Sequence, residues 1–323
     1  MAGRRKWSPI RPARPHLYAT ARGAMQARMK PRTGTVRFAQ PARHVARVTL
    51  QRPKVRNAQN TALIEDLAAA IRRARDDDEV RVVILAAAGP HFSSGHDLKA
   101  QMGLEAPDEW RRMRSTAEGR YRHEREMYFD KCLEIHDLPK VTIAQVQGGC
   151  IAAGMMLACM CDLIVASEDA FFANPVVRMT AAGVELLVEP WEIGFRKAKE
   201  FLFTGESIDA REAWRLGLAN RVVPRNELAA ETLALARRIA EVPLSTLRTV
   251  KDSINQAQDF AGKGHSLRYH FLAHQFQHST KTSLDALDER RALGSVRAMV
   301  AARDARPTGR NTAAGGKRRG GRE

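Results

Sequence analysis

Two glycine-bearing segments contain the residue types best suited to chemistry in this chain. The first is FSSGHDL at 92–98, which follows a β-branched run at 80–86. The second is 148–154, which follows another such run at 141–146 and opens a small, apolar stretch typical of a buried helix. The free N–H groups at a helix start stabilise negative charge, and glycine lets a ligand approach the backbone closely. If the two preceding strands are parallel neighbours, one N–H from each segment could hold a single oxygen, as in an oxyanion hole.

The elements around these segments predict an α/β body with a mostly parallel sheet. A helix that starts with Thr61 as its N-cap and ends near Asp76 separates the first two predicted strands. From about residue 227 the pattern is almost entirely helical. We predict a core over 34–230, a helical region over 231–303, and disordered basic tails at 1–33 and 304–323. The predicted strands are 45–50, 80–86, 141–146, 163–166 and a short edge strand at 220–224.

The net charge of +17 belongs to the ends of the chain. Residues 1–56 hold 15 Lys or Arg and no acid, and residues 303–323 hold 7 basic residues against two acids. The body between them is therefore close to neutral.

Four cysteines indicate no disulfide framework, and Cys159 and Cys161 are better explained as small buried residues than as metal ligands. We expect no metal site and no membrane span, and we favour the cytoplasm over an organelle reached by an Arg-rich transit peptide.

Several segments in order resemble the crotonase family, also called the enoyl-CoA hydratase/isomerase superfamily. They include VTLQRPKVRNAQN at 48–60, KVTIAQVQGGCIAAG at 140–154 and the segment 196–224, within a resemblance that covers about 36–260. The resemblance implies a spiral of ββα repeats with a helical C-terminal trimerisation region, assembled as a homotrimer or hexamer. It also implies binding of an acyl-CoA thioester, with coenzyme A as part of the substrate and no separate cofactor.

The resemblance assigns the two N–H groups that hold the thioester oxygen to His96 and Ala153. Fixed donors there would stabilise an enolate without reorganising. Only the backbone of His96 is implied, and the role of its imidazole stays open. The further substrate-binding candidates are Gly95 and Gly149 beside the donors and Lys99 and Arg56 near the phosphates of coenzyme A, with Arg52 and Lys54 as similar cations.

The chain departs from hydratases at the two positions where they carry acid/base glutamates. Met156 and Val176 stand there, so the usual two-glutamate addition of water is not available. We predict Glu185 as the acid/base, with apolar neighbours that raise its pKa toward a working value. The alternative is that Glu185 is a charge at a helix start. Asp97 is expected to be structural, because its side chain can accept hydrogen bonds from loop N–H groups.

Three functions remain open from the sequence. The first is hydration or isomerisation of an enoyl-CoA through an oxyanion-stabilised enolate. The second is acyl-CoA binding by a catalytically degenerate site. The third is RNA binding by the basic tails, against which the near-neutral body and the lack of aromatics interleaved with the arginines both argue.

Overall fold

The computed structural model describes residues 34–101 and 115–305. The tail predicted over 1–33 lies outside these residues, as does all of the tail predicted over 304–323 except its first two residues. The described residues belong to one compact unit. In the described part of the chain, no helix has both the length and the apolar character needed to cross a bilayer.

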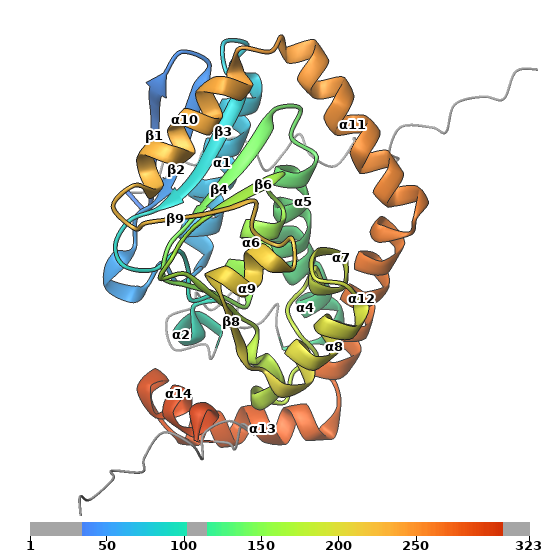
Figure 1. Ribbon diagram of the computed structural model, residues 1–323. Coiled ribbons are helices and arrows are strands. Elements are labelled where there is room, and N and C mark those ends of the chain that lie inside the picture. The colour runs from blue at the N-terminus through green and yellow to red at the C-terminus, as the bar shows by residue number, and fades with distance from the viewer. Residues whose placement is uncertain (1–33, 102–114, 306–323) are drawn as a thin grey trace, which may run out of the picture. The chain divides into compact units, whose positions relative to one another are not determined.

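A six-stranded sheet forms the centre of the core (Figure 1). Its strands lie in the order β1-β2-β3-β4-β6-β9, with β1 antiparallel to β2 and every other neighbouring pair parallel. The predicted parallel sheet is therefore confirmed, but β1 was missed because its half-buried residues do not alternate clearly in polarity. The strands are β1 (Val36–Ala42), β2 (Val45–Leu50), β3 (Val82–Ala87), β4 (Val141–Val146), β6 (Leu163–Ser167) and β9 (Arg221–Val223).

Helices cover both faces of this sheet, which explains why its strands are apolar on both sides. In Figure 1, α10 (Leu228–Ala240) crosses in front of the strands and α1 (Thr61–Asp76) lies behind them. Residues of β3 alternate between the two layers, so that Ile84 packs in the cluster that contains α10 and Leu85 in the cluster that contains α1. Asn60, not Thr61, caps α1: its side chain accepts a hydrogen bond from Leu63 N at 3.0 Å. Asn is an equally good cap, so the prediction was wrong by one residue.

A second, three-stranded sheet lies next to the first and leads into the central helix. The two glycines after β4 do not form only a turn: Gly149 is the first residue of β5 (Gly149–Ile151), a strand that was not predicted from the sequence. β5 pairs with β7 (Phe171–Ala173), which pairs with β8 (Ser207–Asp209). Helix α6 (Ala153–Cys159) follows, and all of its residues are buried, as expected for the small, apolar stretch that begins in this segment.

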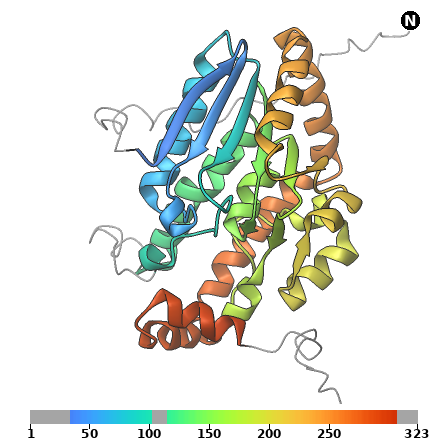
Figure 2. The same cartoon turned by 60° about the vertical axis from the view of Figure 1, so that its left-hand side comes forward.

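The remaining helices surround this core and form the C-terminal region. The helical character predicted from residue 227 is confirmed as far as the structure describes the chain. In Figure 2 the C-terminal helices, coloured orange to red, run past the sheet from its upper end to below it. They are α11 (Leu244–Phe260), α12 (Lys263–His278), α13 (Lys281–Ala292) and α14 (Val296–Asp304); the others are α2 (Leu98–Gln101), α4 (Ala117–Glu124), α5 (Asp130–His136), α7 (Glu189–Glu192), α8 (Phe195–Thr204) and α9 (Ala210–Arg215).

Candidate active site

The two glycine-bearing segments meet at the carboxyl edge of the large sheet. They follow β3 and β4, which are parallel neighbours as predicted. Ile151 N donates to Ser93 O at 2.9 Å. Gly95 has φ +86°, and a Cβ built on it would lie 2.9 Å from Ile151 O and 3.2 Å from Ala153 N. The segments therefore pack backbone against backbone, at a distance that only glycine permits.

The backbone N–H groups of His96 and Ala153 are not used within the part of the chain that the structure describes: neither donates a hydrogen bond there. Ala153 is the first residue of α6, so its N–H has no carbonyl within the helix to bond. Ala152, immediately before it, has φ +51°, a conformation that costs about 1–3 kcal/mol in a residue other than glycine. Its N–H donates to Ala173 O at 2.7 Å, which anchors the strained turn to β7.

A cavity of about 510 Å³ is lined by His96 and by Ala152, the residue that precedes Ala153; Ala153 and Gly95 themselves do not line it. Glu185 lines it as well, so the structure brings the predicted acid/base residue to the predicted oxyanion loops. Gly149 does not line the cavity: it lies in β5, where its N–H donates to His91 Nδ1 at 2.9 Å. Of the other residues named from the sequence, the lining includes Arg52, Lys54, Arg56, Asp97, Lys99 and Val176.

Glu185 is buried and is hydrogen-bonded to the imidazole of His96. Glu185 Oε2 lies 2.8 Å from His96 Nε2, and 2% of the Glu185 side chain is exposed. Burial alone would raise the pKa of Glu185, but the charge and hydrogen bond of His96 outweigh it and lower the pKa. The raised pKa predicted from apolar neighbours is therefore wrong. His270 Nε2 donates to Val184 O at 2.8 Å and so fixes the backbone next to Glu185.

The imidazole of His96 is held on its other side by an aromatic ring. The ring of Tyr128 lies against it, with 4.1 Å between ring centroids. His96 Nδ1 is buried and has no hydrogen-bond partner among the residues that the structure describes. Because Nε2 is held by Glu185, Nδ1 is the ring nitrogen of His96 that no described residue engages.

A second group of titratable side chains on the cavity wall was missed in the sequence. Glu124 from α4 and His274 and His278 from α12 all line the cavity. Burial lowers the pKa of His278 to about 4, so its imidazole is neutral at pH 7. The spacing of the two histidines was visible in the sequence, but Glu124 is far away along the chain and only the tertiary structure brings it to them.

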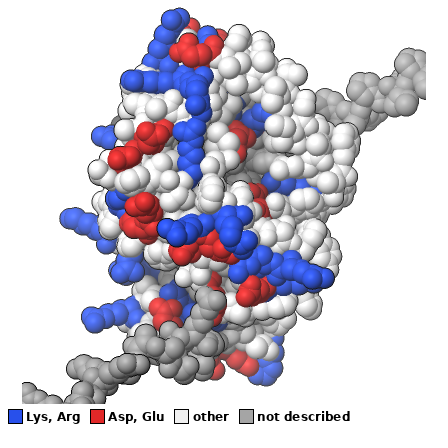
Figure 3. Space-filling model, in the orientation of Figure 1, with Lys and Arg blue, Asp and Glu red and all other residues white. Residues whose placement is uncertain are grey.

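The cations near the entrance divide into paired and exposed residues. Arg52 Nη1 lies 2.9 Å from Asp97 Oδ2, and Asp97 Oδ1 also accepts from Lys99 N at 3.2 Å. These contacts agree with a structural role for Asp97. Lys54 and Arg56 are exposed where they line the cavity. Figure 3 shows basic and acidic side chains interspersed on one face of the molecule.

The two positions matched to hydratase glutamates carry side chains that do not titrate. Met156 is fully buried in the core, and Val176 lines the cavity. Neither can accept or donate a proton. Among the residues matched to the family or named from the sequence, the titratable side chains buried at this cavity are therefore Glu185, His96 and the structural Asp97.

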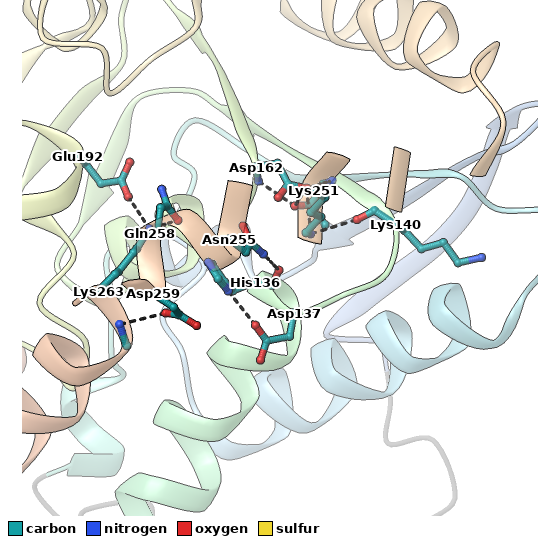
Figure 4. Close-up of polar contacts among 12 residues, drawn as sticks. His136, Asp137, Lys140, Asp162, Glu192, Lys251, Asn255, Gln258, Asp259 and Lys263 are labelled. Atoms are coloured by element: carbon teal, nitrogen blue, oxygen red, sulfur yellow. Dashed lines mark hydrogen bonds and ion pairs between the residues drawn. The ribbon is translucent and has the colours of Figure 1, made fainter. Parts of the chain in front are cut away.

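A separate cavity of about 410 Å³ lies beneath α11 and has a different character. Its buried lysines are paired: Lys251 Nζ lies 3.0 Å from Asp162 Oδ2, and Lys263 Nζ lies 3.4 Å from Glu192 Oε1 (Figure 4). Lys251 also donates to Lys140 O at 3.1 Å. These contacts tie α11 and α12 to the core, so we assign them a structural role.

Comparison with known proteins agrees with this geometry. A family model described as enoyl-CoA hydratase/isomerase matches residues 41–294. The EchA13 protein of Mycobacterium tuberculosis, named as an enoyl-CoA hydratase, is 45% identical over 73% of this chain and 77% of its own length. Human enoyl-CoA hydratase domain-containing protein 3, a mitochondrial protein, is 36% identical over 68% of each chain.

Solved structures give the same result for the fold. An enoyl-CoA hydratase/isomerase from Xanthobacter autotrophicus Py2 superposes with a TM-score of 0.76 at 33% identity, covering 85% of this chain and 98% of that one. A probable enoyl-CoA hydratase from Mycobacterium smegmatis gives 0.70 at 43% identity, covering 76% and 94%. The α/β core and helical C-terminal region are thus those of the crotonase fold, and this chain belongs to the enoyl-CoA hydratase/isomerase family.

Proposed function

We propose that the chain is an enzyme that binds an acyl-CoA thioester in the cavity at the sheet edge and stabilises its enolate. The observation that carries the proposal is the close packing of the Gly95 and Ala153 segments, beside which two backbone N–H groups have no partner within the described residues. Both N–H groups would donate to the thioester oxygen, at His96 N and Ala153 N. Charge that develops on that oxygen would then meet fixed donors, and each would lower the barrier by about 3 kcal/mol.

Glu185 and His96 act together as the acid/base in this proposal. Glu185 accepts the hydrogen bond from His96 Nε2 and holds the imidazole in the tautomer that leaves Nδ1 unprotonated. Nδ1 takes a proton from the substrate, and the resulting imidazolium is stabilised by the buried carboxylate. The lowered pKa of Glu185 supports this assignment, because the carboxylate stays ionised and attracts the proton to the imidazole.

Two reactions of an enoyl-CoA use such a site. In isomerisation, the pair removes a proton from the α carbon of a 3-enoyl thioester, the electron pair delocalises onto the thioester oxygen, and the proton returns at the γ carbon. In hydration, the pair takes a proton from water as its oxygen bonds to the β carbon, and a proton is delivered to the α carbon. Isomerisation requires one group that removes a proton and returns it at another carbon. A single acid/base pair can therefore catalyse isomerisation more simply than hydration.

Spectrophotometry with defined thioesters tests the proposal. Purified full-length chain is mixed with crotonyl-CoA, longer 2-enoyl-CoA or 3-enoyl-CoA, and the ultraviolet absorbance of the conjugated thioester is followed. Hydration decreases this absorbance and isomerisation of a 3-enoyl thioester increases it. Tight acyl-CoA binding without turnover of either class would overturn the enzymatic proposal in favour of a binding protein. RNA binding would involve tails outside the described residues, and nothing in the described core favours it.

Assembly and location complete the proposal. Large apolar side chains are exposed on α11 and α12, among them Ile254, Phe260, Tyr269 and Phe276, and a trimer or hexamer would cover them. Light scattering of the purified chain gives the number of subunits, and a monomer would contradict this part. We propose the cytoplasm as the location, although the similar proteins include both bacterial and mitochondrial ones.

A further inference from the structure

Three side chains that commonly bind metal ions converge on the wall of the same cavity. They are Glu124 on α4 and His274 and His278, which lie one turn apart on α12 and so face the same side of the helix. Glu124 and His274 are almost fully buried, and 29% of the His278 side chain is exposed. Their ligand-type atoms all lie within 4.8 Å of one another, the only such group among the residues that the structure describes.

The distances within this group resemble those between ligands of one ion. A metal bound about 2.0–2.2 Å from nitrogen and oxygen ligands separates neighbouring ligand atoms by about 3.0–3.5 Å. Here His278 Nε2 and His274 Nε2 are 3.0 Å apart, and His274 Nε2 and Glu124 Oε2 are 3.4 Å apart. The third separation, between His278 Nε2 and Glu124 Oε2, is 4.0 Å. Two of the three distances fit a bound ion without change. The distance between His278 Nε2 and Glu124 Oε2 must shorten, and the partly exposed side chain of His278 can make this shift.

Hydrogen bonds explain these contacts less completely than a cation does. His278 Nε2 and His274 Nε2 lie 3.0 Å apart and can share only one proton. The nitrogen that accepts this proton carries no hydrogen of its own, so it cannot donate a hydrogen bond to Glu124. A divalent cation accepts electron pairs from all three atoms at once. The carboxylate is also held in place by α12 itself, because Gln275 Nε2 donates to Glu124 Oε2 at 2.6 Å, and a carboxylate oxygen can accept a hydrogen bond while it binds a metal ion.

We propose that Glu124, His274 and His278 bind one divalent transition-metal ion of the zinc class. Two imidazoles and one carboxylate suit zinc, iron, cobalt or nickel better than magnesium or calcium, which prefer oxygen ligands alone. All three residues line the cavity, so the remaining coordination positions face the space where a substrate would bind. The proposal concerns this chain's own ligands and does not depend on the reaction proposed above. No metal site was expected from the sequence, in which Cys159 and Cys161 were the metal ligands considered.

Cobalt and zinc binding to the full-length chain tests the proposal. The chain is purified without an affinity tag, stripped with a chelator and titrated with Co²⁺ while the visible absorption of the bound ion is recorded. Zn²⁺ binding is measured in parallel by calorimetry. We expect one equivalent of ion, with Zn²⁺ displacing Co²⁺. His278→Ala should weaken binding at least about 10-fold, and His274→Ala and Glu124→Gln should do the same.

Matched variants keep the test decisive. His265 lies on the same helix but is exposed, so His265→Ala should bind the ion as the wild type does. His278→Ala removes the least buried of the three ligands, and its circular dichroism spectrum shows whether the chain is folded. The proposal is overturned if the wild type binds no stoichiometric ion, if folded His278→Ala binds with wild-type affinity, or if His265→Ala loses as much affinity as the cavity variants.

Discussion

Replacement of Gly95 by Ala tests directly whether the two packed loops form an oxyanion hole. The new methyl group would lie 2.9 Å from Ile151 O and 3.2 Å from Ala153 N, and the residue would have to keep φ near +86°. Ordinary contacts to a carbonyl oxygen or an amide nitrogen are longer. The two loops must therefore move apart, and the N–H groups of His96 and Ala153 lose their common target.

Gly95→Ala should affect both the stability of the fold and the rate of the reaction, by different amounts. A left-handed conformation costs an L-residue about 1–2 kcal/mol, which lowers the free energy of unfolding by that amount. Misalignment of one oxyanion donor raises the barrier by about 3 kcal/mol, which corresponds to a decrease of about 100-fold in kcat/KM. The loss should fall mainly on kcat, because the donors bind the developing charge more strongly than the ground-state carbonyl.

Gly217 provides a matched control. It has φ +85°, almost the same as Gly95, but a Cβ there would meet nothing within 4 Å. Gly217→Ala should lose only the free energy of unfolding that comes from its positive φ, a smaller loss than that of Gly95→Ala, and should keep wild-type kcat/KM. Steady-state assays of both variants with the best enoyl-CoA thioester, beside urea unfolding curves, give the comparison. If Gly95→Ala is as active as Gly217→Ala, the reasoning from loop packing to oxyanion stabilisation is refuted.

Three further predictions concern buried charges. Glu185→Gln should lower kcat by about 10²–10⁴-fold with little change in acyl-CoA affinity, because it removes the partner of His96; an unchanged kcat contradicts the acid/base assignment. The folded pKa of Glu185 is below its ordinary 4.5, so its stabilisation is present above that pH and lost as pH falls through the folded value. Urea midpoints of the wild type should therefore fall below pH 4.5 more steeply than those of Glu185→Gln, and parallel curves would remove this linkage. Asp162→Ala leaves the buried Lys251 without its carboxylate and should lower the free energy of unfolding by about 3 kcal/mol, whereas Lys281→Ala, at an exposed pair, should have no measurable effect.

The sequence alone determined which strands and loops form the site. Buried runs separated by a helix predicted parallel strands, and parallel strands that are neighbours place their following loops at one edge. The two glycine-bearing loops could therefore be placed together from the sequence, and the resemblance to the crotonase family named His96 and Ala153 as the donors within them. These inferences use local patterns and short spacings, which the chain encodes within a few residues. Strand β1 was not predicted because the burial of its residues does not alternate. Strand β5 was not predicted because three residues are too few to show a period.

Only the tertiary structure decided which charges meet. Glu185 and His96 are 89 residues apart, and no local pattern specifies their contact. The sign of a pKa shift depends on that contact, since burial and an opposite charge act in opposite directions and their balance is set by distance. Apolar neighbours in the sequence therefore gave the wrong direction for Glu185. The meeting of Glu124 with His274 and His278 was hidden for the same reason: packing of α4 near α12 creates it, and neither helix encodes it alone.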